Sequence, residues 1–229
     1  MTTCEIETML ELRDITKSFP QQRVLEGISL TVGDGESVAI MGPSGSGKST
    51  LLHCMSGVLV PDQGEVLFDG RDVAAISDAE RSRLRLEHFG FIFQDGQLLP
   101  ELTATENVAL PQIMRGVPRS QAHDEAIDML TRLGLGAYVD RYPGQLSGGQ
   151  GQRVAIARAL AGPPSVVFAD EPTAALDQAT GHEVMQQIVA VCQKFGVTLV
   201  VVTHDPKIAD WCSRRVEIRD GLIHSEVAR

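Results

Sequence analysis

The hydropathy pattern of the chain predicts two kinds of sheet. Near the amino terminus apolar residues recur with polar residues between them, at Leu10, Leu12, Ile15, Leu25, Ile28, Leu30 and Val32. This near-alternation is typical of half-exposed antiparallel strands. Further on, the apolar runs 37–41, 166–169 and 197–203 are separated by helical patterns over 48–58, 151–160 and 181–194. Strands that alternate with helices predict an α/β fold with a mostly parallel sheet.

The middle of the chain lacks the alternation of apolar runs and helices. Residues 78–87 and 120–133 have helical patterns, whereas the stretch between them is rich in proline and glycine and is expected to be irregular. We therefore expect an α-helical subdomain inserted into an α/β core that also carries an amino-terminal antiparallel β subdomain. The expected boundaries are 1–90 and 151–229 for the core and about 91–150 for the helical subdomain, within one domain of residues 1–229.

Composition and charge narrow the class of protein. The chain has 229 residues, of which 43% are hydrophobic and 22% charged, which is typical of a globular domain. A net charge of -10 repels nucleic acid, so we expect no nucleic-acid partner. The longest apolar run is far shorter than the roughly 20 residues of a membrane span, and the amino-terminal segment lacks the apolar region of a secretory signal. The four cysteines are Cys4, Cys54, Cys192 and Cys212. Their spacing suggests neither a zinc site nor a disulfide framework, so we expect reduced cytosolic thiols, two of which lie in the core.

A glycine-rich loop follows the apolar run 37–41 and precedes a predicted helix. Its residues are Gly42, Pro43, Ser44, Gly45, Ser46, Gly47, Lys48, Ser49 and Thr50, which contain the pattern G-x-x-x-x-G-K-[ST]. Glycines let backbone N–H groups converge on a phosphate, and the helix start adds its positive dipole end. Lys48 would reach the β- and γ-phosphates, and the Ser49 hydroxyl would bind Mg²⁺. The loop predicts ATP and Mg²⁺ as ligands, the alternative being a chance glycine-rich turn.

Two carboxylates, Asp170 and Glu171, directly follow the apolar run 166–169. Carboxylates at the end of a buried strand are costly unless they meet a cation or take part in chemistry. Asp170 is expected to associate with Mg²⁺. Glu171 would point in a different direction and polarise the attacking water. The alternative is a solvated strand end with two ordinary acids.

A second glycine motif precedes the predicted helix 151–160. It consists of Leu146, Ser147, Gly148, Gly149 and Gln150. Its N–H groups would form another anion site at a helix start. A single ATP cannot easily use both helix starts of one chain. We therefore expect a head-to-tail dimer, in which each ATP lies between the phosphate loop of one copy and residues 147–149 of the other.

With this motif the chain resembles the ATP-binding subunits of ABC transporters, whose signature sequence is the pentapeptide 146–150. The resemblance spans nearly the whole chain and implies an ATPase with a phosphate-loop NTPase core. It also implies roles for four further residues. Gln94 matches the Q-loop and would sense Mg²⁺ or water, and Asp177 matches the D-loop. His204 matches the switch histidine at the γ-phosphate, and Phe19 stands where the family stacks an aromatic ring on adenine.

Several of these residues also have a plain structural interpretation. Gln94 could be an ordinary loop amide, His204 a structural histidine at a strand end, and Phe19 a core aromatic beside a strand. Arg153 and Arg158 lie on the helix after the signature and are expected to form ion pairs on a helix face.

Three stretches resemble one bacterial branch of the family. Residues 98–108 resemble the permease-facing region of lipoprotein-release and macrolide-export systems, while 85–94 and 172–174 resemble haem-export members. The resemblance implies an integral-membrane permease as partner and a peripheral position on the cytoplasmic face of the membrane. It also implies export or extrusion of haem, a lipoprotein, a peptide or a drug-like amphiphile. Two alternatives stay open: the leucines of 98–108 could be only core of the helical lobe, and the chain could be a regulatory ATPase that controls a cell-envelope partner without transport.

Overall fold

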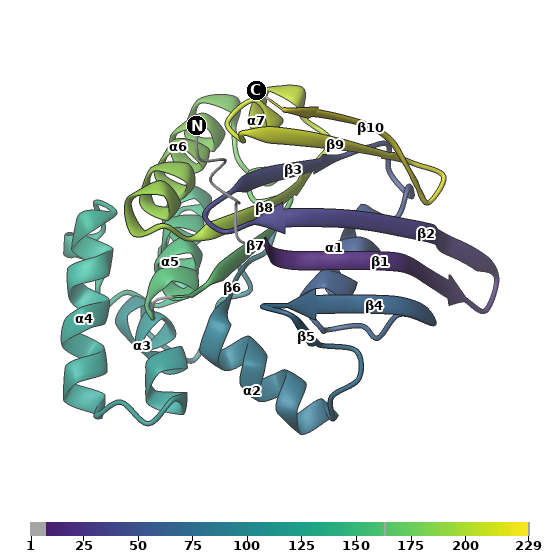
Figure 1. Cartoon of the computed structure of the whole chain (residues 1–229). Helices are drawn as coiled ribbons and strands as arrows, with labels where there is room; N and C mark the ends of the chain where they lie inside the picture. Colours follow the sequence, from purple (N-terminus) through teal and green to yellow (C-terminus); the bar gives the residue numbers. More distant parts are fainter. Residues whose placement is uncertain (1–7, 163, 229) are drawn as a thin grey trace, which may run out of the picture.

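The computed structural model describes residues 8–162 and 164–228, with the elements arranged as in Figure 1. The strands are β1 (Thr8–Phe19), β2 (Gln22–Gly33), β3 (Ser37–Met41), β4 (Gln63–Phe68), β5 (Arg71–Asp72), β6 (Phe89–Ile92), β7 (Val166–Asp170), β8 (Thr198–Thr203), β9 (Arg214–Arg219) and β10 (Leu222–Ala228). The α-helices are α1 (Lys48–Met55), α2 (Asp78–His88), α3 (Ala104–Met114), α4 (Arg119–Arg132), α5 (Gly148–Leu160), α6 (Gln178–Phe195) and α7 (Pro206–Ala209). Two 3₁₀ turns, η1 (Gly136–Tyr138) and η2 (Pro143–Gln145), precede α5.

A six-stranded sheet lies at the centre of the molecule, in the order β10-β9-β3-β8-β7-β6. Strands β9, β3, β8, β7 and β6 run parallel, and β10 pairs antiparallel with β9. Both faces of the sheet are covered, so every residue of β8 is buried. Ala169 and Val201 pack in a cluster with α3 to α6, while Phe168 and Val200 face α1 and the second sheet. The prediction of an α/β fold with a mostly parallel sheet is confirmed.

The second sheet is antiparallel, in the order β2-β1-β4-β5. It contains the alternating amino-terminal segment, and side chains such as Leu12, Ile15 and Leu25 are at most 1% exposed. The register of β1 against β2 shifts between Leu12 and Ile15, where Asp14 has a φ of 51°. This irregularity explains why two buried residues are three positions apart in an otherwise period-two pattern.

The segment between α2 and α4 is more regular than predicted. It contains strand β6, which adds an edge to the central sheet, and helix α3, which has Pro111 in its last turn. Thr103 and Glu106 close a capping box at the start of α3, and Val108 and Ala109 are fully buried. Proline is tolerated in the first turn of a helix, but in the last turn it removes a backbone hydrogen bond to the carbonyl four residues earlier, and burial of the apolar face of α3 offsets this cost. Strand β6 also lies across the expected subdomain boundary at about residue 91.

Helix α5 begins earlier than predicted. The pattern over 151–160 indicates its apolar part, but the helix starts at Gly148, with Ser147 as its N-cap. Two glycines in a first turn contribute no hydrophobic periodicity, which is why the pattern misses them. The two signature glycines are therefore part of the helix rather than of a preceding loop.

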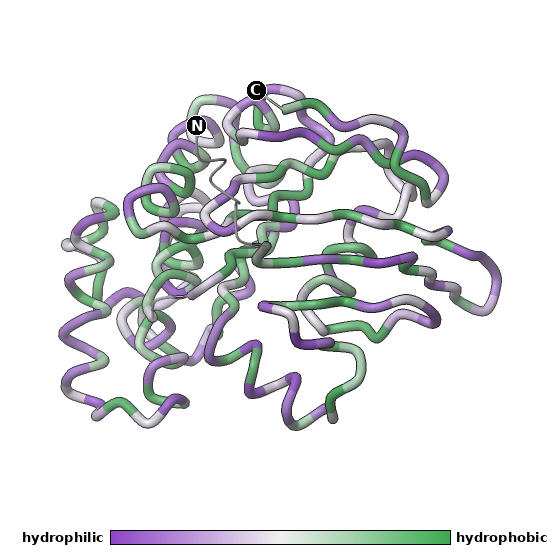
Figure 2. Tube along the Cα trace, viewed as in Figure 1, coloured by the Kyte–Doolittle hydropathy of each residue, from purple (hydrophilic) through white to green (hydrophobic). Residues whose placement is uncertain are grey.

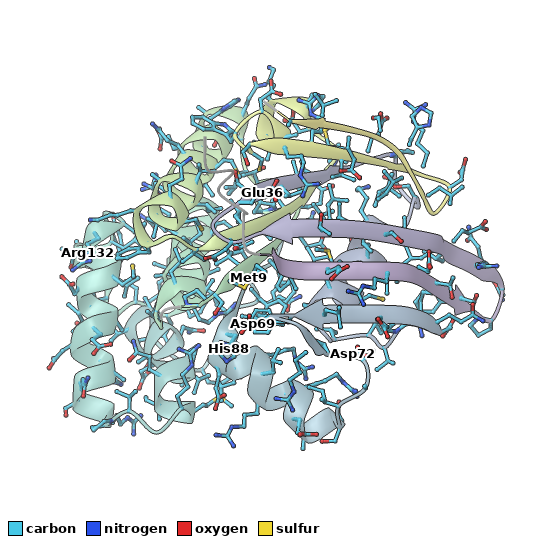
Figure 3. All side chains as sticks on the ribbon, viewed as in Figure 1. Met9, Glu36, Asp69, Asp72, His88 and Arg132 are labelled. Carbon is cyan, nitrogen blue, oxygen red and sulfur yellow. The ribbon has the colours of Figure 1, made fainter. Side chains whose placement is uncertain are left out.

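The hydrophobic segments concentrate where the central sheet meets its neighbours, whereas the outer helix α4 alternates between apolar and polar residues (Figure 2). Figure 3 labels Arg132 on α4, and His88 at the end of α2 near Asp69. The ring of His88 lies 5.3 Å from that of Phe68. Within residues 8–162 and 164–228, no helix has the length and apolarity needed to cross a membrane.

The cysteines give a test of this core. Cys54, Cys192 and Cys212 are all buried and unpaired by disulfides, one more than the two expected, while Cys4 lies outside the described residues. Burial raises the pKa of Cys54 to about 11 and the pKa values of Cys192 and Cys212 to about 12. At pH 8 the native protein is therefore expected to react with Ellman's reagent at Cys4 at most, and at all four thiols once unfolded in guanidinium. Rapid native labelling of two or more thiols would contradict this packing.

Candidate nucleotide site

The glycine-rich loop between β3 and α1 is shaped by close contacts that leave no room for side chains. Gly47 precedes α1 with a φ of 100°, and a Cβ there would lie 2.9 Å from both Leu25 Cδ2 and the carbonyl oxygen of Val24. A Cβ at Gly42 would overlap the carbonyl oxygen of Ile218. Glycine is therefore required at both positions. The supporting residues lie on β2 and β9, and nothing in the local sequence of the loop points to them.

The loop contains two buried polar side chains, those of Lys48 and Ser46. Lys48 is 7% exposed, and its Nζ donates to the carbonyl oxygens of Gly42 (2.9 Å) and Pro43 (3.0 Å), with no carboxylate partner in the described part of the chain. The Ser46 hydroxyl is buried without a hydrogen-bond partner there. Ser44 and Gly45 are exposed at the loop tip, and Thr50 is half-buried in α1. A buried cation and a free hydroxyl in a cradle of glycines fit an anionic phosphate.

Ser49 and Asp170 meet although they are 121 residues apart in the chain. The Ser49 hydroxyl donates to Asp170 Oδ1 at 3.1 Å, which places a hydroxyl and a carboxylate side by side next to the loop. Both are hard oxygen donors of the kind that Mg²⁺ prefers. No group of three or more His, Cys, Asp or Glu residues suited to a metal occurs among residues 8–162 and 164–228. The pair therefore fits a Mg²⁺ ion shared with nucleotide phosphates better than an ion held by protein alone.

Glu171 is held in an unusual backbone conformation beside His204. Its φ is 46°, a region that costs a non-glycine residue energy, and its N–H donates to the carbonyl oxygen of Val202 at 2.9 Å. Glu171 Oε1 lies 2.8 Å from His204 Nδ1. The Glu171 side chain is 20% exposed and that of His204 64%. The Glu171 carboxylate thus contacts a solvent-accessible histidine, whereas Asp170 accepts from Ser49.

A cleft of about 250 Å³ is lined by Glu171, Asp177 and His204. Asp177 is the N-cap of α6, and its carboxylate accepts hydrogen bonds from the Thr180 hydroxyl and from the N–H groups of Thr180 and Ala179. The Thr180 hydroxyl and then its N–H hold the pKa of the Asp177 carboxyl below its usual range. Asp177 thus has a structural task in the fold, which the sequence comparison with a D-loop did not reveal.

The signature residues form the first turn of α5. Ser147 Oγ accepts from the N–H of Gln150 at 3.3 Å, and Gln150 Oε1 accepts from the N–H of Ser147 at 2.8 Å. This capping box occupies the Gln150 side chain that the sequence suggested as a ligand. A Cβ at Gly149 would lie 2.7 Å from Thr180 Cγ2, so this glycine also permits close approach of α6. The N–H groups of Gly148 and Gly149 remain at a helix start, where an anion is favoured.

Gln94 lines a different cavity from the Glu171–His204 pair. It lines a cavity of about 240 Å³ together with Leu98, Ser147 and Gly148. The described residues show no hydrogen bond or ion pair between the phosphate loop and residues 147–150. Within the described residues, Ser49 therefore contacts Asp170, Glu171 contacts His204, and Gln94 shares a cavity with Ser147, while the two glycine motifs share no hydrogen bond or ion pair.

Two residues of α5, Gln152 and Arg158, contact the segment around the Q-loop, and the first was missed and the second misread from the sequence. Gln152 is 3% exposed, and its Nε2 donates to the carbonyl oxygens of Phe93 (3.0 Å) and Pro172 (2.7 Å). Gln152 shares a helix face with buried apolar residues, and a lone amide on such a face is the signal that could have found it. Arg153 forms the predicted ion pair, with Glu183, at 2.9 Å.

The prediction of an ion pair is wrong for Arg158. Its guanidinium donates to the carbonyl oxygens of Gln97 and Gly96, both at 2.7 Å. The reason is tertiary: α5 packs its carboxyl half against the loop that follows β6, so backbone carbonyls and not a carboxylate face the side chain.

Phe19 lies at the tip of the β1–β2 hairpin, where it pairs with Gln22, and it is 44% exposed. The interpretation as a core aromatic is therefore wrong. Val24, two residues beyond Gln22, contacts the Gly47 position, so this hairpin end lies beside the phosphate loop. An exposed ring there is placed where it can receive a planar base.

The strand–loop–helix around Lys48 and the adjacent Ser49–Asp170 pair define an α/β nucleotide-binding protein of the phosphate-loop class. Residues 25–174 match the ABC transporter domain family, and the chain belongs to this family of ATP-hydrolysing, nucleotide-binding transporter components.

Relatives in sequence agree with this assignment. The chain is 45% identical to the lipoprotein-releasing system ATP-binding protein LolD of Shewanella frigidimarina, covering 95% of this chain and 92% of LolD. It is 45% identical to the ABC transporter ATP-binding protein YtrE of Bacillus subtilis, covering 94% and 96%. It is 47% identical to the macrolide export ATP-binding/permease protein MacB of Photorhabdus laumondii, covering 96% of this chain but 35% of that longer protein. These relatives confirm the resemblance to the lipoprotein-release and macrolide-export branch. They fit the interpretation as a transporter subunit and not the alternative of a regulatory ATPase.

Solved structures give the same answer for the fold. The chain superposes on the dimeric structure of MJ0796, a bacterial ABC transporter cassette, with a TM-score of 0.89 and 39% identity, covering 96% of this chain and 98% of that one. A dimeric post-hydrolysis state of the same cassette, bound to ADP and Pi, superposes with a TM-score of 0.88. The prediction that the family binds adenine nucleotide is therefore confirmed.

Proposed function

We propose that this chain is the ATPase component of a bacterial extrusion system, in which two copies close around two ATP·Mg²⁺ and thereby drive a membrane permease. The observation that carries the proposal is the separation of two anion sites within one chain, beside a carboxylate–histidine pair. Gly42 to Thr50 would hold the phosphates, with Lys48 at the β- and γ-phosphates. Phe19 would stack on the adenine. The proposed substrate is ATP, converted with water to ADP and phosphate.

The Mg²⁺ ion would be held by the Ser49 hydroxyl, with Asp170 close by and Gln94 completing the site. Bound Mg²⁺ neutralises charge that develops on the phosphates. Gln94 is exposed at the loop after β6, and Gln152 holds the start of that loop through the carbonyl of Phe93. Movement of α5 would therefore reposition Gln94, which supports a role as a sensor of the nucleotide rather than as a plain loop amide.

Glu171 would act as the general base, and His204 would orient it and contact the γ-phosphate. The support is the 2.8 Å contact between the two side chains and the strained backbone of Glu171, which aims the carboxylate at the cleft. The exposed position of His204 leaves it free to change partner when phosphate is present. Asp177 would border the same cleft from the start of α6.

The second copy would supply Ser147 to Gln150 across a two-fold axis. Support comes from the helix start at Gly148, which shares no hydrogen bond with the phosphate loop in the described residues, and from the dimeric assemblies of the similar cassette. The Ser147–Gln150 capping box would keep that helix start rigid.

A permease would be the partner, and the chain would then work at the cytoplasmic face of the membrane. The support is the similarity to LolD and MacB, whose names refer to lipoprotein release and macrolide export. Within 98–108, Leu99 is 42% exposed whereas Val108 is fully buried. This segment is thus partly core and partly surface. The proposed cargo class is a lipid-modified or amphiphilic molecule that is moved outward.

A mixed dimer tests the shared site. Lys48→Ala and Ser147→Arg each inactivate both sites of a homodimer, but a heterodimer of the two keeps one intact site. By random pairing, an equal mixture is expected to recover up to about one quarter of the wild-type ATPase rate. The measurement is phosphate release after co-refolding, with each variant alone as control. A mixture no more active than the mean of the two homodimers would contradict a shared site.

A further inference from the structure

The end of the β1–β2 hairpin carries Phe19 and is not fixed by its own turn. Only Pro20 and Gln21 separate β1 from β2 (Figure 1). The two-residue hairpin turns that match the twist of the strands need a positive φ at their first position, which proline cannot adopt. Neither Pro20 nor Gln21 has a positive φ, so the favoured hairpin turns are excluded here. The ring of Phe19 therefore needs another support.

The strand pairing of β1 is also interrupted just before Phe19. On one side, the pairing of β1 with β4 ends where Thr16 lies opposite Gln63. On the other side, the register of β1 against β2 shifts between Lys17 and Ser18. Such an irregularity leaves a residue unpaired and bends the strand locally. The backbone that presents Phe19 thus lies beyond the end of one ladder and beyond a bulge in the other.

Asp62, directly before β4, supplies the missing support. Its N–H donates to the carbonyl oxygen of Thr16 at 2.8 Å. One oxygen of its carboxylate accepts from the N–H of Ser18 at 2.6 Å, and the other accepts from Lys17 Nζ at 2.8 Å. Asp62 therefore binds three consecutive residues of β1, the last of which is the direct neighbour of Phe19. Hydrogen bonds to a charged acceptor are stronger than those between neutral groups, so this carboxylate can replace a strand carbonyl at the Ser18 N–H.

The same contacts connect the hairpin end to the helix of the phosphate loop. Lys17 Nζ also donates to the carbonyl oxygen of Val60 at 2.8 Å, and both Val60 and Asp62 lie on the segment that follows α1. The Lys17 side chain is only 17% exposed. Burial raises the pKa of Cys54, on α1, to about 11, and the charges of Lys17 and Asp62 also act on this thiol, which places the pair beside α1. Because α1 begins at Lys48, these contacts hold Phe19 in a fixed relation to the phosphate loop.

We infer that Asp62 is a positioning residue for the nucleotide base: by binding Ser18 and Lys17, it holds the ring of Phe19 where adenine can stack on it. The inference rests on the proposed function, because it takes ATP as the ligand and Phe19 as the stacking residue. It adds the residue that sets the geometry between the base and the phosphates. Stacking acts on the base and not on the phosphate chain. Loss of the Asp62 carboxylate is therefore expected to weaken binding of ATP and to leave binding of a bare phosphate chain unchanged.

A double-mutant cycle with two ligands tests this inference. The variants are Asp62→Ala, Phe19→Ala and the combination of both. The ligands are ATP and inorganic tripolyphosphate, each with Mg²⁺, and tripolyphosphate has the phosphate chain but no base. The matched control is Glu65→Ala, because Glu65 also joins β4 to β1, through Arg13 at 3.2 Å, but six positions before Phe19. Isothermal titration measures each dissociation constant, and circular dichroism verifies that each variant is folded.

Asp62→Ala is expected to raise the dissociation constant for ATP about tenfold, within the range for loss of one stacked base. The double variant is expected to bind ATP within about twofold of Phe19→Ala alone, because both changes remove the same contact. Tripolyphosphate is expected to bind all variants, and ATP to bind Glu65→Ala, within about twofold of the wild type.

Two further measurements separate positioning from a general structural role. Asp62→Asn keeps an oxygen that can accept from the Ser18 N–H, so it is expected to recover most of the affinity for ATP. At saturating ATP, the hydrolysis rate of Asp62→Ala is expected to stay within about twofold of the wild type, because Asp62 lies outside the Glu171–His204 cleft. The effect of Asp62→Ala is thus expected in KM and not in kcat.

Four outcomes would overturn the inference. Equal weakening of ATP and tripolyphosphate by Asp62→Ala would show that Asp62 supports the phosphate loop and not the base. Effects that multiply in the double variant would show that Asp62 does not act through Phe19. If Phe19→Ala weakens ATP binding but Asp62→Ala does not, Asp62 has no positioning role while the proposed function stands. If Phe19→Ala binds ATP as the wild type does, the proposed adenine contact fails together with the inference.

Discussion

Glu171→Gln is expected to lower the rate of ATP hydrolysis roughly 10²–10⁴-fold, the range associated with loss of a general base. Glutamine has nearly the same shape, so the hydrogen bond to His204 and the backbone geometry of Glu171 can persist while the capacity to accept a proton is lost. Affinity for ATP is expected to be unchanged. The measurement is single-turnover hydrolysis of radiolabelled ATP together with equilibrium binding of ATP.

A matched control separates the base from a general loss of charge. Glu183→Gln removes an exposed carboxylate of α6 that pairs with Arg153, outside the cleft, and should leave hydrolysis within about twofold because surface pairs contribute little. The Glu171→Gln protein should also accumulate as an ATP-bound dimer in size-exclusion chromatography. Wild-type turnover by this variant would remove Glu171 from the role of base.

Lys48→Ala is expected to weaken ATP binding by about 2–5 kcal/mol, or roughly 30-fold to several thousandfold. The Lys48 ammonium is buried, and among the described residues it donates to the carbonyl oxygens of Gly42 and Pro43 and to no carboxylate. A phosphate in the loop would therefore meet a cation that is not already paired with a carboxylate of this part of the chain, and the alanine variant removes that cation. Isothermal titration with ATP and Mg²⁺ measures the loss directly.

The control for this variant is Lys207→Ala, an exposed lysine on α7, which should bind ATP as the wild type does. Thermal unfolding of both variants without nucleotide distinguishes a lost ligand contact from a damaged loop. Unchanged ATP affinity of a folded Lys48→Ala protein would contradict the assignment of the loop as a phosphate site.

Local features of the site could be predicted because they depend on consecutive residues. The loop 42–50 acts through backbone groups of consecutive residues. A residue whose task depends on distant partners was less accessible: Arg158 binds the backbone carbonyls of residues 96 and 97 rather than a carboxylate. The caps formed by Asp177 and Gln150 have partners within three residues, but the motif resemblance suggested ligand roles for these side chains and not local capping.

The errors in secondary structure have a similar cause. Helix α3 contains a proline that argues against a helix, but its buried face and capping box stabilise it. Helix α5 starts at two glycines that carry no hydrophobic signal. In both places, tertiary packing outweighs the local preference of the residues involved.

The sequence by itself determined the class of chemistry and the α/β architecture, because a phosphate-binding loop and the alternation of apolar runs are properties of contiguous segments. Only the tertiary structure decided which groups meet. It joins Ser49 to Asp170 across 121 positions and Glu171 to His204 across 33. The physical reason is that hydrogen bonds and charge pairs act over a few ångströms, and the packing of the sheet and its helices sets those distances.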